Sequence, residues 1–180
     1  FKLPEKKEKF VFTFNPKERL RELKFALLHK NSEFIIPLRG GAGALHLIPN
    51  LKKLKIKDKK ILIGSSDFTY LGIYLLEKFK FPFCHGPMLS DLGRDDFSKR
   101  EEKYFLDILN KRNFYYKNLK GLKILKEGFS EGKLIGGNLT LIVSMLSFFK
   151  FSSFKDKILF LEDVNEPLYR IDRNLFILKM

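Results

Sequence analysis

The chain has 180 residues, of which 44% are apolar and 31% are charged, and it carries a formal net charge of +14. This balance excludes a disordered protein and indicates a folded chain with a sizeable core. No stretch approaches the roughly 18 uncharged apolar residues of a membrane span, because the longest candidate, Leu139 to Phe149, is too short. The single cysteine, Cys84, excludes an internal disulfide framework and disfavours a thiolate metal cluster.

The excess of basic residues raises the question of a polyanionic partner. Lysines are spread along the whole chain, with one cluster between Lys52 and Lys60, and no RNP-like motif, zinc finger or arginine-rich arm accompanies them. We therefore interpret the charge mainly as a solvated basic surface and do not expect nucleic acid as a partner. Binding of an anionic ligand or of a weak, non-specific polyanion also fits the charge.

The first residues contain no secretory signal, because the charges between Glu5 and Lys9 interrupt any apolar region. Together with the lone cysteine, this favours a cytoplasmic location. The sequence begins with Phe1 rather than Met, so we expect processing or truncation to have removed the natural start.

Apolar spacing and breaker residues predict helices and strands that alternate along the chain. Asn15 is expected to cap the first helix, with Pro16 in its first position. The predicted helices span residues 15–30, 44–54, 67–79, 94–111 and 138–149, with a last one from residue 167 onward. The predicted strands span residues 33–38, 60–64, 81–84 and 157–161, with a short one around residues 122–125. This order predicts an α/β fold with a mainly parallel sheet flanked by helices.

In such sheets functional sites gather at the carboxyl ends of the strands. We therefore expect four loops to lie close together, namely those that follow Leu38, Gly64, Cys84 and Leu161.

The segment after Gly64 places a serine in a tight turn between a strand and a helix. A hydroxyl in such a turn stands clear of the sheet, and the N-terminus of the next helix offers N–H groups to a developing oxyanion. The turn resembles a nucleophile elbow, although Phe68 replaces the second glycine of that motif. The alternative is that Ser65 or Ser66 only caps the helix.

A glycine-rich loop from Arg39 to Gly43 also follows a predicted strand. It lacks the Lys-Ser/Thr ending of a phosphate-binding loop. It is either a plain turn or, beside Ser66, the source of a second oxyanion donor through the N–H group of Gly41.

Two carboxylates, Glu162 and Asp163, end an apolar strand, where a charged group is costly to bury without a partner. A carboxylate that orients a catalytic histidine would explain this position. The alternative is that both face solvent or pair with Arg170 or Arg173.

Five short blocks follow one another along the chain: Arg39-Gly40-Gly41-Ala42-Gly43, Gly64-Ser65-Ser66-Asp67-Phe68-Thr69, His85-Gly86-Pro87-Met88, Gly136-Gly137-Asn138-Leu139 and Phe160-Leu161-Glu162-Asp163. In this order they resemble the LD-carboxypeptidase family of serine peptidases, which also includes the microcin C self-immunity peptidases. The resemblance runs from about Asn15 to Arg173 and so covers most of the chain.

The resemblance implies a Ser-His-Glu triad in which Ser66 is the nucleophile and Glu162 orients the histidine. It also implies an oxyanion hole made by the backbone N–H groups of Gly41 and Asp67, and it places Asn138 near the substrate. The cell-wall members remove the terminal D-alanine from a murein tetrapeptide by cleaving an L,D bond. No metal or other cofactor takes part, and homodimers are common in the family.

The resemblance further implies that residues 1–110 form most of a Rossmann-like domain with the nucleophile, and that residues 111–180 form a linker and the beginning of a C-terminal domain with the triad glutamate. The family usually has an aromatic residue where Ala42 and Ser65 stand. Its histidine follows the glutamate by a substantial further segment, whereas the last histidine here is His85. We therefore expect a chain that is truncated at both ends, lacks the catalytic histidine and is nearly inactive alone.

Of the three histidines present, His85 is the best candidate for a substitute base, because it ends a strand at the sheet edge that carries Ser66. A loop-stabilising hydrogen bond is its other interpretation. His29 lies at a helix C-terminus, and His46 lies one turn into a helix. Three functions stay open: an LD-carboxypeptidase, a noncatalytic basic binding module, or a related amide hydrolase of the microcin-immunity kind.

Overall fold

The computed structural model describes residues 15–110, 121–151 and 154–180. Its strands are β1 (Phe34–Ile35), β2 (Ile61–Gly64), β3 (Phe83–His85), β4 (Lys133–Asn138) and β5 (Lys157–Glu162). Its helices are α1 (Pro16–Leu28), α2 (Ile48–Leu51), α3 (Thr69–Phe79), α4 (Lys99–Leu109), α5 (Leu139–Met145) and α6 (Leu168–Lys179). Two short 3₁₀ helices, η1 (Ala44–Leu47) and η2 (Ser66–Phe68), precede α2 and α3.

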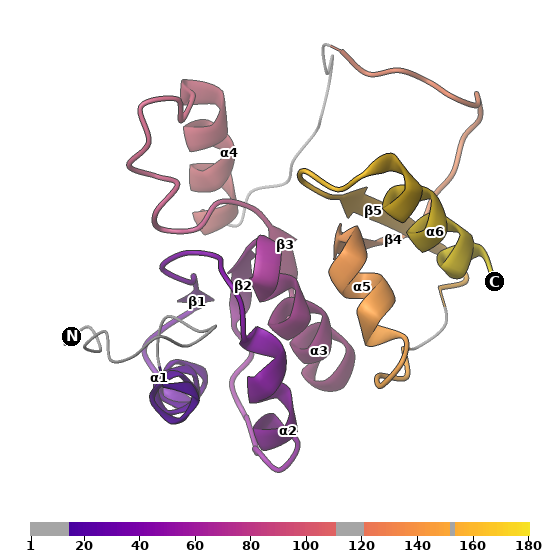
Figure 1. Cartoon of the computed structure of the whole chain (residues 1–180). Coiled ribbons are helices and arrows are strands. Elements are labelled where there is room, and N and C mark those ends of the chain that lie inside the picture. The colour runs from indigo at the N-terminus through magenta and orange to yellow at the C-terminus, as the bar shows by residue number, and fades with distance from the viewer. Residues whose placement is uncertain (1–14, 111–120, 152–153) are drawn as a thin grey trace.

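The described strands form two parallel sheets, one of β1, β2 and β3 in that order and one of β4 and β5. In the first sheet Gly64 pairs with His85, and in the second Asn138 pairs with Glu162. Each pair closes its ladder at the carboxyl end of the strands. Helix α3 lies between the two sheets, where it contacts β2 and β3 on one side and β4 and α5 on the other (Figure 1).

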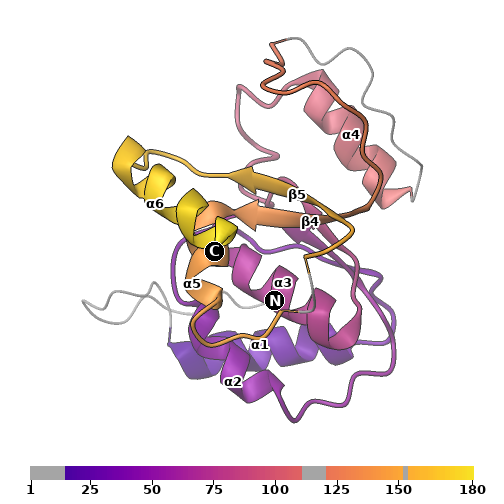
Figure 2. The same ribbon diagram turned by 90° about the vertical axis from the view of Figure 1, so that its right-hand side faces the viewer.

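The core is built around α3, whose sequence is apolar on nearly every side and therefore suits a helix covered by neighbours on all sides. Its residues Thr69 to Leu75 are all buried. Against them pack Leu23 and Leu27 of α1 and other apolar side chains of the first sheet and of α2. Beyond this core, β4 and β5 run side by side, and α5 packs against α6 (Figure 2).

A buried lysine ties the end of α1 to the start of β2. The Lys60 side chain is 1% exposed, and its ammonium group donates hydrogen bonds to the backbone oxygens of His29 and Ser32 and to the Ser32 hydroxyl. Since His29 is the C-cap of α1, the cation lies at the negative end of the helix dipole. This capping explains how a charged residue is accommodated beside the first sheet.

The predicted fold class is confirmed, since parallel strands alternate with flanking helices. The first helix begins at Pro16 with Asn15 as its cap, as expected, because the Asn15 side chain accepts a hydrogen bond from the Lys17 N–H group. The strand β1 is shorter than predicted, and the predicted helix 44–54 divides into η1 and α2. Helix α4 begins only at Lys99, because Ser98 and Glu101 form a capping box there. The end of its predicted range, residue 111, lies outside the described residues.

The short strand expected around residues 122–125 is wrong. These residues form no strand, and Leu122, Ile124 and Leu125 are 70–88% exposed. The strand in this part of the chain is β4, whose glycines at 136 and 137 weakened its signal in the sequence. Within the described ranges, none of the helices combines the length and apolar character that crossing a bilayer requires.

Gly64 provides a test of the packing at the end of β2. A Cβ atom added there would lie 2.6 Å from Cδ1 of the buried Phe68 and 3.0 Å from Cγ of Pro37. We expect Gly64→Ala to lower the free energy of unfolding by about 1–3 kcal/mol, because the added methyl group would overlap the buried Phe68 ring and crowd Pro37. Urea denaturation measures this change.

The matched control is Gly93→Ala, because a Cβ atom at Gly93 would meet no atom within 4 Å. Its free energy of unfolding should change by less than about 0.5 kcal/mol. Equal unfolding midpoints for the two variants would contradict the packing described for Gly64.

Candidate active site

Ser66 lies in a strained turn directly after β2. Its φ angle is +53°, in the left-handed region that residues other than glycine rarely adopt. Ser65 before it is extended, and η2 begins at Ser66 itself. Because the Ser66 side chain is exposed, the turn presents the hydroxyl at the carboxyl end of the sheet instead of burying it. Strain of this kind is stored where the surrounding structure fixes it, often at functional sites.

The glycine-rich loop after β1 lies directly against Ser66. A Cβ atom added at Gly40 would lie 3.2 Å from both Cβ and Oγ of Ser66. A side chain at this position would therefore crowd the serine, which explains a glycine here. Gly41, the next residue of the loop, has a φ angle of +137°, and a Cβ atom added there would meet no atom within 4 Å. At Gly41 the backbone conformation, and not a lack of space, therefore favours glycine.

The Asp67 side chain holds this loop in place. Its Oδ2 atom accepts a hydrogen bond of 2.9 Å from the Ala44 N–H group and lies 3.8 Å from Nη2 of Arg19. Arg19 also donates a 2.7 Å hydrogen bond to the Ala42 carbonyl. Burial raises the pKa of Asp67, and the bond from Ala44 and the charge of Arg19 partly offset this. From the sequence only the backbone of Asp67 was expected to take part in the site. The contacts by which the Asp67 and Arg19 side chains hold the glycine loop were not predicted.

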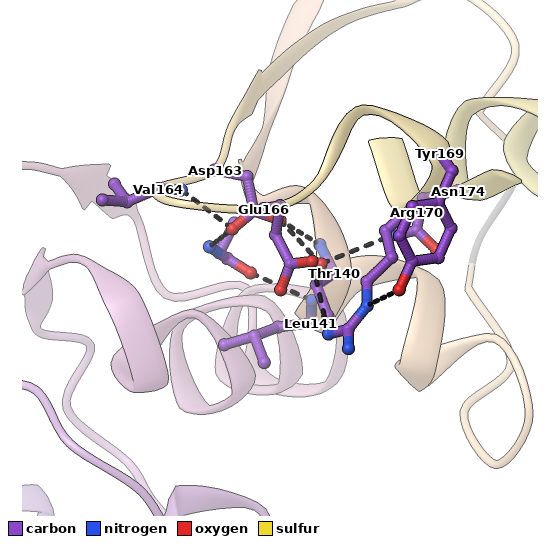
Figure 3. Close-up of polar contacts among 9 residues, drawn as sticks. Thr140, Leu141, Asp163, Val164, Glu166, Tyr169, Arg170 and Asn174 are labelled. Atoms are coloured by element: carbon purple, nitrogen blue, oxygen red, sulfur yellow. Dashed lines mark hydrogen bonds and ion pairs between the residues drawn. The ribbon is translucent and has the colours of Figure 1, made fainter. Parts of the chain in front are cut away.

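The other sheet ends in two neighbouring carboxylates that have different surroundings. The Asp163 carboxylate accepts hydrogen bonds from the Asn138 side chain, from the N–H and hydroxyl groups of Thr140, and from the Val164 N–H group (Figure 3). Burial acts to raise the pKa of Asp163, but the bonds from Thr140 and Asn138 outweigh it and the pKa is lowered. Asp163 is therefore a structural anchor that ties the end of β5 to the start of α5.

Glu162 is not part of this anchor. Burial raises its pKa, the charge of Asp163 raises it further, and a hydrogen bond from Asn138 partly offsets both. The alternative that these carboxylates pair with Arg170 is wrong, because Arg170 lies 3.5 Å from Glu166 and contacts the Tyr169 hydroxyl (Figure 3). Of the two acids, Glu162 is the one with a carboxylate left for chemistry.

Asn138 ties the second sheet to the start of α3 near this point. Its N–H group donates a 3.3 Å hydrogen bond to the hydroxyl of Thr69, three residues after Ser66. Its side-chain oxygen accepts a bond from Leu141 N–H and so caps α5. Asn138 is thus tied both to the helix that follows Ser66 and to the carboxylates at the end of β5.

The end of β3 completes this edge of the molecule. His85 pairs with Gly64, and its Nε2 atom lies 3.7 Å from Oε1 of Glu162. Together with the contact between Gly40 and Ser66, this confirms that the loops after β1, β2, β3 and β5 lie close together. A groove of about 320 Å³ opens beside the end of β3, lined by Ser65, His85, Gly86, Pro87, Asp91, Arg94, Phe97, Glu101, Tyr104, Phe105 and Ile108.

The other candidate side chains are placed less favourably for chemistry. Burial raises the pKa of the Cys84 thiol, which leaves it a poor nucleophile. His29 caps the end of α1, where its ring lies tilted against that of Phe25. His46 is exposed on η1.

The strain at Ser66 predicts an inverted order of stability for two substitutions. Ser66→Gly should unfold with a higher free energy than Ser66→Ala, by up to about 1 kcal/mol, because glycine adopts a positive φ angle without a Cβ clash. Urea denaturation of the two variants measures the difference.

At Ser90, an exposed serine whose φ angle is not positive, alanine should be at least as stable as glycine. If alanine is also the more stable residue at position 66, the turn is not strained in solution.

Comparisons with known proteins agree on one family. The profile of the LD-carboxypeptidase N-terminal domain matches residues 2–86, and that of the LD-carboxypeptidase C-terminal domain matches residues 131–180. The murein tetrapeptide carboxypeptidase of Pseudomonas aeruginosa is 32% identical over 172 residues, which are 88% of this chain and 54% of that protein.

Solved structures show the same similarity. The muramoyltetrapeptide carboxypeptidase of Oxalobacter formigenes superposes with a TM-score of 0.72 at 28% identity, over 96% of this chain and 59% of that one. A MccF-like protein of Bacillus anthracis has a TM-score of 0.79 over 94% of this chain and 60% of that one, and at 22% identity it supports the fold alone. The chain spans about half the length of the curated relatives it matches. The chain belongs to the LD-carboxypeptidase family of peptidases.

Proposed function

We propose that the protein containing this chain is a serine-type LD-carboxypeptidase that releases the terminal D-alanine of murein tetrapeptides by acyl transfer. The observation that carries the proposal is the exposed Ser66 hydroxyl in a strained turn, packed so closely against Gly40 that a Cβ atom added there would lie 3.2 Å from Oγ. The names of the relatives supply the substrate class, because one is a murein tetrapeptide carboxypeptidase and another a muramoyltetrapeptide carboxypeptidase.

In the proposed reaction, the Ser66 oxygen attacks the carbonyl carbon of the L,D peptide bond while a histidine accepts the hydroxyl proton. The N–H groups of Gly41 and Asp67 stabilise the oxyanion of the tetrahedral intermediate. The imidazolium then returns its proton to the departing amine of D-alanine, and water hydrolyses the acyl-enzyme by the same route. Asn138 lies at the edge of this site and would contact the substrate.

Glu162 orients the catalytic histidine in this proposal. We do not assign the role of base to any of the three histidines at positions 29, 46 and 85. A carboxylate that lies free of the Asp163 anchor and near the nucleophile's sheet suits this role. The division into a nucleophile domain (1–110) and a glutamate-bearing segment (111–180), the cytoplasmic location and homodimer formation stay predictions.

Release of D-alanine tests the nucleophile. The chain is expressed together with any sequence that its gene encodes on either side and is incubated with a muramyl tetrapeptide. Ser66→Ala should lower kcat/KM for D-alanine release by about 10⁴-fold or more, because the triad acts as a unit. Mass spectrometry of the shortened peptide measures the rate.

Ser147→Ala is the matched control, since Ser147 is exposed and follows α5 at the end opposite to Asn138, and it should retain full activity. Equal rates for Ser66→Ala and the unsubstituted protein would reject Ser66 as the nucleophile. Peptide binding without release by the unsubstituted protein would favour the noncatalytic binding module.

The raised pKa of Glu162 predicts a titration that can be measured directly. Because burial and Asp163 disfavour the ionised form, Glu162 should take up its proton at a higher pH than the ordinary value of 4.5, as pH falls. Asn138→Ala should move the midpoint higher still, because it removes the side-chain hydrogen bond from Asn138 that lowers the pKa of Glu162. The ¹³C shift of the Glu162 carboxyl carbon, assigned with Glu162→Gln, gives the midpoint.

Asp163 should titrate in the same spectra below its ordinary value of 3.8, because its pKa is lowered. If Glu162 titrates at or below 4.5, the two carboxylates do not have the different surroundings described for them.

A further inference from the structure

His85 lies at the junction of the two sheets and contacts both. It ends β3, where it pairs with Gly64 of β2, and its ring packs on Phe160 of β5 with centroids 5.1 Å apart. Its Nε2 atom lies 3.7 Å from Oε1 of Glu162, and the two side chains are only 22% and 27% exposed. The histidine and the glutamate therefore meet in a partly desolvated place, where a polar contact is stronger than at the surface.

The surroundings of the ring indicate how it is protonated. Burial lowers the pKa of His85, so the ring is neutral at neutral pH and carries one proton. The Nδ1 atom is buried without a hydrogen-bond partner among the described residues. A proton on Nδ1 would have no acceptor there, whereas Nε2 lies 3.7 Å from a carboxylate oxygen of Glu162. The geometry therefore favours the tautomer in which Nε2–H faces Glu162.

Other charged groups near His85 are already engaged. On the side of the groove, Asp91 accepts a hydrogen bond from Met88 N–H and lies 3.6 Å from Arg94. Glu101, also in the groove, accepts hydrogen bonds from the N–H and hydroxyl groups of Ser98. Tyr104 lines the same groove. On the side of β5, Asp163 is bound by Thr140 and Asn138. Glu162 is thus the carboxylate that the His85 ring is placed to hold.

We propose that His85 is a positioning residue for Glu162, holding that carboxylate at the junction of the two sheets through its neutral Nε2–H group. The inference rests on the proposed function, in which Glu162 orients the catalytic base. His85 itself touches no reacting atom in this scheme. The 3.7 Å separation is long for a hydrogen bond, and contacts of this kind tighten when the substrate binds.

Two substitutions separate positioning from packing. His85→Leu keeps the apolar contact with Phe160 but removes the donor, and His85→Gln places an amide N–H group near the position of Nε2. We expect His85→Leu to lower kcat for D-alanine release by about tenfold or more with KM little changed, because a hydrogen bond to a charged group is lost. His85→Gln should recover most of kcat.

The Glu162 titration provides a second readout that does not depend on activity. Without the Nε2–H donor, the carboxylate form loses stabilisation, so the pKa of Glu162 should rise in His85→Leu and return toward the original value in His85→Gln. His29→Gln is the control, because His29 caps α1 outside the site, and it should change neither kcat nor this pKa.

The outcomes distinguish this inference from the proposed function. An active protein whose kcat and Glu162 pKa are unchanged in His85→Leu overturns the positioning role. Equal losses in His85→Leu and His85→Gln, with lower unfolding temperatures, also overturn it, because they indicate packing alone. An unsubstituted protein that releases no D-alanine overturns the proposed function, while the titration still decides whether His85 holds Glu162.

Discussion

The position of α3 between two parallel sheets is the constraint on which the site depends. The helix is buried along its first two turns, so its N-terminus cannot shift without disturbing both sheets. That N-terminus carries Ser66 just before it and Thr69 at its first residue, and Thr69 accepts the hydrogen bond from Asn138. One rigid element therefore sets the distance between the serine turn and the strand ends that bear the acids.

Polar contacts then fix the parts that α3 alone cannot hold. Asp67 and Arg19 clamp the glycine loop against Ser66, and Asp163 clamps the end of β5 to the start of α5. Both carboxylates serve structure and lie next in sequence to a residue proposed for chemistry. Asp67 is anchored beside Ser66, and Asp163 is anchored beside Glu162. The hydroxyl of Ser66 and the carboxylate of Glu162 are not part of these anchors. This arrangement agrees with the view that reactive groups need rigid support.

Much of this organisation was predictable from the sequence. The alternation of apolar runs with helical patterns predicted a mainly parallel sheet, which the structure divides into two parallel sheets, and the rule on strand ends predicted which loops meet. The five sequence blocks predicted the family, and the resemblance predicted Ser66 and Glu162 as residues of the site. The tight turn between Gly64 and the helix was predicted, but the positive φ angle at Ser66 was not, because a simple cap explained the same residues.

Other features could not be predicted, for identifiable reasons. The strand β4 was missed because glycines at 136 and 137 lack the side chains that mark strands. The clamp by Arg19 and the contact between His85 and Glu162 join residues far apart in the chain, which local patterns do not report. The different roles of Glu162 and Asp163 depend on hydrogen bonds from Asn138 and Thr140, and adjacent acids look alike in a sequence.

The contact between Thr69 and Asn138 spans 69 residues of chain, and this separation bears on when the catalytic centre can form. Closing so long a loop is slow compared with forming a helix or a local turn. The serine turn belongs to the first sheet, whereas the acids arrive with β4 and β5. A growing or partly folded chain can therefore display the Ser66 hydroxyl before β4 and β5 bring Glu162 to the same edge, so the two groups meet only after the last strands have docked.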